Sequence, residues 1–164
     1  MRSFLLKLCQ TTLAAACMTA VLAAPAAAKE TEIEIKEADV PGPVMATVKR
    51  TYPNAKVTKF ELEEENGQRL YEVTLHDGGK ELEAKLTAQG ALVEEEEVIT
   101  EKDLPEPVRK SLAASHYAKA KIGKIERVVK KDKKAPPTFE IKVTDGGKTV
   151  ELLYDAAGKL LGKE

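Results

Sequence analysis

The feature that most constrains the fold of this chain is an internal repeat. Residues 39–90 and residues 103–158 carry the same apolar, proline and glycine positions in the same order. Solenoid repeats have periods of about 20–50 residues, whereas the offset here starts at 64 residues. The pattern therefore indicates a duplicated small domain. The clearest matching segments are Asp39-Val-Pro-Gly-Pro-Val44 with Asp103-Leu-Pro-Glu-Pro-Val108, Tyr71-Glu-Val73 with Phe139-Glu-Ile141, and Asp77-Gly-Gly-Lys80 with Asp145-Gly-Gly-Lys148.

Each copy begins with the pattern of a short helix. Asp39 and Asp103 are expected to be the N-caps, because their side chains can accept hydrogen bonds from the first helical N–H groups. Pro53 should end the first helix, and the second should end at residues 115–117. Apolar residues recur every four positions, which predicts one narrow buried stripe on each helix. The stripe residues are Val44, Val48 and Tyr52 in the first copy and Val108 and Leu112 in the second.

Alternation of apolar and polar residues after each helix predicts antiparallel strands with one apolar face. Asn66-Gly67 and the two Asp-Gly-Gly segments fit two-residue hairpin turns, because these turns need positive φ. Val57 is out of phase with Phe60, which predicts a β-bulge or a strand start there. The apolar strand positions are Tyr71, Val73, Leu75, Leu82, Ala84 and Leu86 in the first copy and Phe139, Ile141, Val143, Val150, Leu152 and Tyr154 in the second.

Two more short strands are expected around each copy. One should precede the helix, at residues 33–35 in the first copy and at Val98 and Ile99 in the second. Another should follow the turn at Gly90 or Gly158. Each copy would then end on a strand of its own.

The expected fold class is therefore α+β, with copies at residues 29–99 and 100–164. Each copy is expected to be a short helix packed on an antiparallel sheet of three to four strands. A unit of about 60 residues buries only ~60% of its unfolded surface, so each copy alone would be marginally stable.

Residues 29–100 carry 9 basic and 17 acidic side chains, and residues 101–164 carry 15 basic and 10 acidic ones. Opposite charge favours docking of the halves, although residues 94–97 and 130–134 are more simply interpreted as solvated strand ends and loops.

Residues 1–28 have the pattern of an export signal. Two basic residues precede an apolar stretch that ends in small residues at 26–28, typical of a cleavage site. We expect residues 1–28 to be removed and the protein to be periplasmic or secreted; a lipoprotein anchored at Cys17 is the alternative. Cys9 and Cys17 both lie in this segment, so the processed chain would have no disulfide. No later apolar run approaches the ~20 residues of a membrane-spanning helix.

The processed chain offers little catalytic chemistry. The duplication repeats neither His76 nor His116, and Ser111 and Ser115 lie outside any G-x-S-x-G setting. Zinc-ligand spacing, a calcium loop, a phosphate loop and a dinucleotide fingerprint are all missing from the sequence. We therefore expect a non-enzyme with no catalytic, cofactor-binding or metal-binding residue and no cofactor. An exported chain with 27 acidic residues is also not expected to bind nucleic acid.

The repeated motifs resemble the PepSY-like family, which is grouped with the β-lactamase-inhibitor proteins. The resemblance covers residues 38–164 as two tandem copies. It rests on the Pro-x-Pro segments, on Tyr-Pro-x-Ala-x-Val-x-Lys at 52–59, and on Tyr-Glu-Val-x-Leu-x-Asp-Gly-Gly-Lys at 71–80. The second copy departs from it, with Ala118 in place of Pro53 and a Lys/Pro-rich loop in place of the Asn-Gly hairpin. The resemblance implies a helix on an antiparallel sheet in each copy, export, and a binding or inhibitory role.

The predicted outward face of the strands is charged and solvated. Six aromatic residues fall at predicted core positions, so this face lacks the aromatic anchors of tight interfaces. The outward residues are Glu72, Thr74, Glu81, Glu83, Lys85, Glu140, Lys142 and Thr149, and the core aromatics are Tyr52, Phe60, Tyr71, Tyr117, Phe139 and Tyr154. Glu81 and Glu83 share a strand face, but such carboxylate pairs are expected by chance among so many acidic residues.

The leading functional hypothesis is an exported, non-catalytic binding module that modulates or inhibits a peptidase or another envelope or extracellular protein. Its partner would be another exported protein or peptide, bound weakly and in a salt-sensitive way. The alternative is a small-ligand or cation-sensing module that uses the acidic first copy. A third hypothesis, a weak hydrolase, requires His76 or His116.

Overall fold

The computed structural model describes residues 31–65, 67–131 and 133–163. The predicted export signal, with Cys9 and Cys17, lies outside these residues, as does Asn66 of the predicted hairpin. Within the described ranges, no helix has the length and apolar character needed to cross a bilayer.

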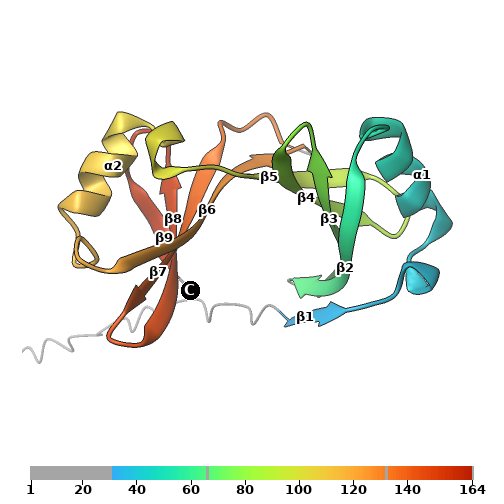
Figure 1. Ribbon diagram of the computed structural model, residues 1–164, viewed down its shortest axis with the longest axis horizontal. Helices are drawn as coiled ribbons and strands as arrows, with labels where there is room; N and C mark the ends of the chain where they lie inside the picture. The colour runs from blue at the N-terminus through green and yellow to red at the C-terminus, as the bar shows by residue number, and fades with distance from the viewer. Residues whose placement is uncertain (1–30, 66, 132, 164) are drawn as a thin grey trace, which may run out of the picture.

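Nine antiparallel strands form a single sheet, and they follow one another across it in chain order (Figure 1). The predicted combination of helices with an antiparallel sheet is confirmed. The expected two sheets of three to four strands are wrong, because the described strands join into one sheet of nine. The strands are β1 (Thr31–Glu34), β2 (Lys56–Glu65), β3 (Gln68–Asp77), β4 (Lys80–Thr87), β5 (Leu92–Val98), β6 (Lys121–Lys130), β7 (Thr138–Asp145), β8 (Lys148–Asp155) and β9 (Leu160–Lys163).

Strand β5 explains why there is one sheet. The segment after Gly90 and the segment at Val98 were expected to be separate strands, but both belong to β5. This strand pairs with β4 on one side and with β6 on the other. Its pairing with β6 sets Glu94 beside Lys130, at 3.0 Å, so the predicted docking of the halves occurs through a continuous ladder. The solvated-end interpretation of residues 94–97 is wrong, since Glu94 and Glu96 are buried.

Each half contains a short 3₁₀ turn followed by an α-helix. These elements are η1 (Glu37–Asp39), α1 (Gly42–Thr51), η2 (Glu101–Asp103) and α2 (Glu106–Ala113). The predicted N-caps are wrong, because Asp39 and Asp103 end the 3₁₀ turns and the prolines two positions later cap the helices. The residue before a proline is pushed towards an extended backbone, so a helix cannot run from Asp103 through Leu104. The Asp103 carboxylate instead accepts the Thr100 N–H at 2.9 Å.

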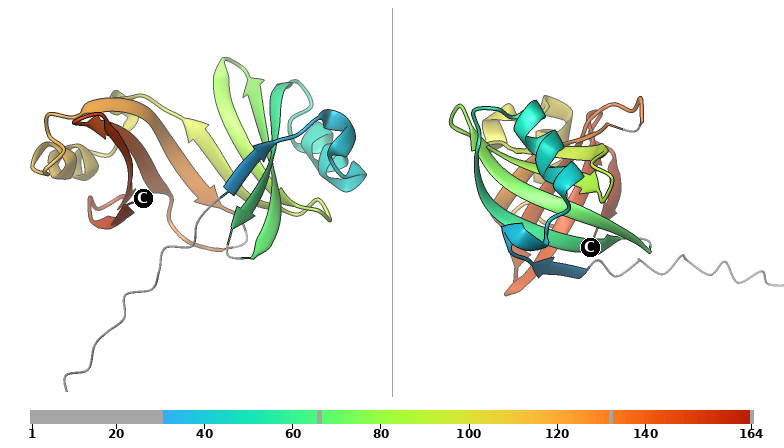
Figure 2. Two further views of the ribbon diagram at one scale, coloured as in Figure 1. Left: turned by 90° about the horizontal axis from the view of Figure 1, so that it is seen from below. Right: turned by 90° about the vertical axis from the view of Figure 1, so that its right-hand side faces the viewer.

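The two helices cover opposite ends of one face of the sheet, and each packs on its own apolar cluster (Figure 2). The predicted helix stripes are confirmed as buried. The predicted core aromatics are also confirmed, with three of them buried and three half-buried against the clusters. Gly90 and Gly158 let the chain approach the helices closely, because a Cβ atom at either position would lie 2.4 Å from the carbonyl oxygen of Pro43 or Pro107.

Hairpin turns and a bulge appear where the sequence predicts them. The two glycines of each Asp-Gly-Gly segment have φ between 56° and 84°, as two-residue turns require. The register of β2 against β3 shifts between Val57 and Lys59, which confirms the predicted bulge. These local irregularities curl the sheet away from the helices, and the helix-free face is left on the inside of the curve (Figure 2).

Candidate functional site

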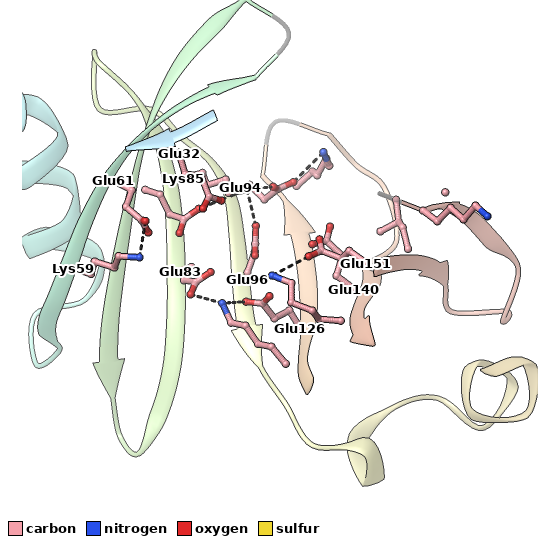
Figure 3. A pocket seen from close by; sticks show the side chains of 17 residues that line it. Glu32, Lys59, Glu61, Glu83, Lys85, Glu94, Glu96, Glu126, Glu140 and Glu151 are labelled. Carbon is pink, nitrogen blue, oxygen red and sulfur yellow. Dashed lines mark hydrogen bonds and ion pairs between the residues drawn. The ribbon is translucent and has the colours of Figure 1, made fainter. Parts of the chain in front are cut away.

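The helix-free face of the sheet surrounds a hollow of about 480 Å³ to which all nine strands contribute (Figure 3). Its lining contains nine glutamates and six lysines, a formal excess of three negative charges. We refer to it as the charged hollow. Its lining residues are Glu32, Lys59, Glu61, Glu72, Glu83, Lys85, Glu94, Glu96, Lys124, Glu126, Lys130, Glu140, Lys142, Glu151, Leu153, Gly162 and Lys163.

Strand alternation places these side chains in the hollow. Successive side chains point to opposite faces of a sheet, so a strand that sends Val73 and Leu75 into the core sends Glu72 to the other side. The strand register then sets Glu72 opposite Lys85, and Lys85 opposite Glu94. Opposite charges that face each other across a ladder stabilise it.

Lys85 is the centre of the first charge cluster. Its ammonium lies 3.1 Å from Glu96, 3.3 Å from Glu63, and 3.7 Å from both Glu72 and Glu94. All five side chains are buried, and Glu63 has no exposed surface. Burial opposes the charge on Lys85, but the four carboxylates outweigh it and raise the pKa of the ammonium. Lys85 therefore stays charged throughout the physiological range.

Lys124 organises a second cluster next to the first. Its ammonium contacts Glu83 and lies 2.8 Å from Glu126. Carboxylate oxygens of Glu83, Glu96 and Glu126 lie within 4.8 Å of one another, a spacing that three ligands of one cation would have. The Lys124 ammonium contacts two of these three carboxyl groups, Glu83 and Glu126, so a metal ion would compete with a cation that the chain already supplies.

A third cluster lies on β7 and β8. The Lys142 ammonium is 3.2 Å from Glu151, and the carboxyl group of Glu140 also interacts with Glu151. Burial, followed by the charge of Glu96 and the contact with Glu151, raises the pKa of Glu140 to about 9.

Two more carboxyls hold protons near neutral pH. Burial and the nearby Glu83 raise the pKa of Glu72 to about 8, against the opposing effect of Lys85. Burial also raises the pKa of Glu126 to about 8, although Lys124 opposes the shift. With Glu140, three carboxyls of the lining therefore have pKa values raised above neutral pH. A cation that enters the charged hollow would replace these protons.

The residues considered for catalysis lie outside the charged hollow. His76 is exposed on β3. His116 follows α2 and lies 3.5 Å from Asp145, with both side chains open to solvent. Ser115 donates a hydrogen bond to the Leu112 carbonyl at 2.7 Å, so it serves the end of α2. The structure therefore brings none of these residues to the hollow; the expectation of no catalytic, cofactor or metal residue stays a prediction.

The sequence interpretation placed the right residues on this face but predicted the wrong environment. Glu72, Glu83 and Lys85 were expected to be solvated, and all three are buried. Glu81, named with Glu83 as a chance pair, lies outside the hollow. Glu63 and Lys124 were missed, and Glu96 was expected to belong to a solvated strand end but is buried. One sequence signal could have indicated these residues. Acidic residues outnumber basic ones in the predicted strands of the first half, whereas basic residues predominate in the second half.

Comparison with protein families identifies the class of the chain. The family described as "Putative beta-lactamase-inhibitor-like, PepSY-like" matches residues 25–94 and 69–162. The chain belongs to this family, and the predicted resemblance is confirmed. A comparison with curated proteins finds no match.

Solved structures from Bacteroides share the fold. A protein of B. eggerthii described as a "putative periplasmic" protein is 18% identical, with a TM-score of 0.65 over 76% of this chain and 88% of that chain. A DUF2874 family protein of B. ovatus is 22% identical, with a TM-score of 0.62 over 77% and 88%. A BLIP-like protein of B. fragilis is 21% identical, with a TM-score of 0.58 over 76% and 85%. At these identities the likeness concerns the fold alone.

Proposed function

We propose that this chain is an exported, non-catalytic binding module whose charged hollow receives a basic segment of another exported protein or peptide. The observation that carries the proposal is the composition of one concave face, where nine glutamates meet six lysines. Ammonium or guanidinium groups of a partner would bind the surplus carboxylates and release their protons. The family description, which refers to inhibitors, supports a role in binding another protein.

The expected affinity is modest. Interfaces of high affinity are centred on Trp, Tyr and Arg side chains in desolvated pockets. The lining of the charged hollow contains none of these residue types, and the aromatic side chains pack in or against the apolar clusters. Binding would therefore depend on charge, and salt would weaken it.

The organisation of the chain fits this proposal. We propose that residues 1–28 direct export and that residues 29–99 and 100–164 descend from one duplicated unit. The close approach of Gly90 to Pro43 and of Gly158 to Pro107, at the same 2.4 Å, supports the duplication. Because β5 joins the halves, both units would present one shared binding face.

A basic peptide tests the proposal directly. We expect a lysine- and arginine-rich peptide to bind at low salt and to dissociate as salt is added. The Glu83→Gln/Glu96→Gln variant removes two charges from the hollow and should weaken binding about tenfold, or about 1.4 kcal/mol. The Glu101→Gln/Glu106→Gln variant removes two charges from the helical side and is the matched control. Equal losses in both variants, or no binding by the unsubstituted chain at low salt, would contradict the proposal.

A second candidate function is cation sensing, favoured by the spacing of Glu83, Glu96 and Glu126. Calcium should then raise the melting temperature, and Lys124→Gln should strengthen this effect because it removes the competing ammonium. If calcium leaves the melting temperature of both proteins unchanged, this candidate is excluded.

A further inference from the structure

The two edge strands of the sheet carry the exposed apolar side chains of the described chain. The large hydrophobic residues exposed in residues 31–65, 67–131 and 133–163 are Ile33 on β1, at 60% exposure, and Leu160 and Leu161 on β9, at 45% and 48%. Among the strands that the structure describes, β1 pairs only with β2, and β9 pairs only with β8. Each edge therefore offers unpaired backbone groups beside an apolar side chain, which is a template for another strand.

The two edges differ in charge. β1 carries Glu32 and Glu34 and no basic residue. β9 carries Lys163 and no acidic residue, and in the sequence it stands between Lys159 and Glu164. Pairing β1 with β9 sets opposite charges side by side, whereas pairing like edges sets like charges together, which destabilises a ladder. The charge pattern thus favours pairing of β1 with β9 over pairing of β1 with β1 or of β9 with β9.

We propose that β9 of one chain pairs with β1 of a second copy, so that the sheet continues from molecule to molecule. This contact is head-to-tail, and it either closes into a ring or grows as an open assembly. Both edge strands also line the charged hollow, through Glu32 and Lys163, so the hollow of one copy would open onto that of the next. Four-residue edges bury little area, and we expect a dissociation constant on the order of 0.1–1 mM.

Blocking one edge at a time tests this pairing. Protein from the exported fraction should show concentration-dependent association in sedimentation velocity, reduced by salt. Ile33→Lys places a basic residue on β1, and Leu161→Glu places an acidic residue on β9; each variant alone should be monomeric. A mixture of the two should form a dimer and no larger species, because each variant retains the edge that the other lacks.

A disulfide version of the experiment does not depend on how well the charged variants fold. The sequence has no cysteine after residue 28. Ile33→Cys and Leu161→Cys should form a mixed disulfide with each other more rapidly than either forms one with itself. An unsubstituted chain that stays monomeric at every concentration overturns the proposal. Association that persists in one edge-blocked variant alone, or equal rates for the three disulfides, also overturns it.

Discussion

The same strands build both faces of this sheet, but different interactions stabilise the two faces. The helix-covered face buries apolar side chains that need no partner beyond close packing. The helix-free face buries charged side chains, and each depends on neighbours of opposite charge or on a bound proton. The stability of the apolar face should therefore change little with pH and salt, whereas the stability of the charged face should depend on both.

Truncation of the apolar face should have the largest effect on stability. Leu152 is fully buried under α2, and Leu152→Ala should cost about 2–5 kcal/mol in the free energy of unfolding because it leaves a cavity. Ile33→Ala, at an exposed position, is the control and should change stability by less than about 0.5 kcal/mol. Chemical denaturation at neutral pH measures both. Similar losses in the two variants would refute the assignment of the core.

Removing the central cation of the charged face should cost nearly as much, but in a way that depends on pH. Lys85→Met leaves four buried carboxyl groups, most of them ionised, without their shared ammonium and should cost about 3 kcal/mol at neutral pH. The cost should shrink as the pH falls, because protonation removes the repulsion. Lys80→Met is the control, since its ammonium is exposed and pairs with Glu97 at 2.7 Å. A loss independent of pH would show that Lys85 contributes packing alone.

The protonated carboxyls predict how stability varies with pH in the unsubstituted chain. Glu72, Glu126 and Glu140 bind protons more tightly when folded than when unfolded, with pKa values of about 8, 8 and 9 against 4.5. The folded chain therefore holds more protons in this interval, and the free energy of unfolding falls as the pH rises through it. We expect the melting temperature to decrease from pH 5 to pH 8.5, and Glu140→Gln to flatten the slope. A melting temperature that rises over this interval would contradict the assignment.

The smallest effect is expected on the helical side. Glu106 and Lys110 form an exposed ion pair at 2.7 Å, four residues apart on α2. Glu106→Gln should change the free energy of unfolding by less than about 0.5 kcal/mol. A larger loss, measured by the same denaturation experiment, would show that exposed and buried charges of this chain do not differ as proposed.

Local sequence patterns were enough to predict much of the fold. The stripe of Val44 and Val48, the Asp-Gly-Gly turns and the bulge at Val57 each depend on residues close together in the chain, and each is confirmed. The helix caps failed because two prolines per helix shift the start beyond Asp39 and Asp103. Local patterns could not show that β5 serves both halves, because pairing with β6 depends on residues about 30 positions further along.

The environment of the candidate site could not be predicted for a related reason. Alternation indicates which face Glu72 and Lys85 occupy, but it does not indicate how far that face is removed from water. Burial of Glu72 depends on the curvature and width of the whole sheet, since the lining comes from all nine strands. Curvature arises from bulges and strand twist summed over many residues. A charged face on a wide antiparallel sheet should therefore not be assumed to be solvated.

The central claim is that the charged hollow keeps carboxyl groups away from bulk water, and NMR titration of the glutamate side-chain carboxyls tests it most directly. The account predicts that Glu72 and Glu126 titrate with a pKa of about 8 and Glu140 with a pKa of about 9. If all three titrated near 4.5, the value of an ordinary glutamate in water, the helix-free face would be an open, solvated surface, and the account would be wrong.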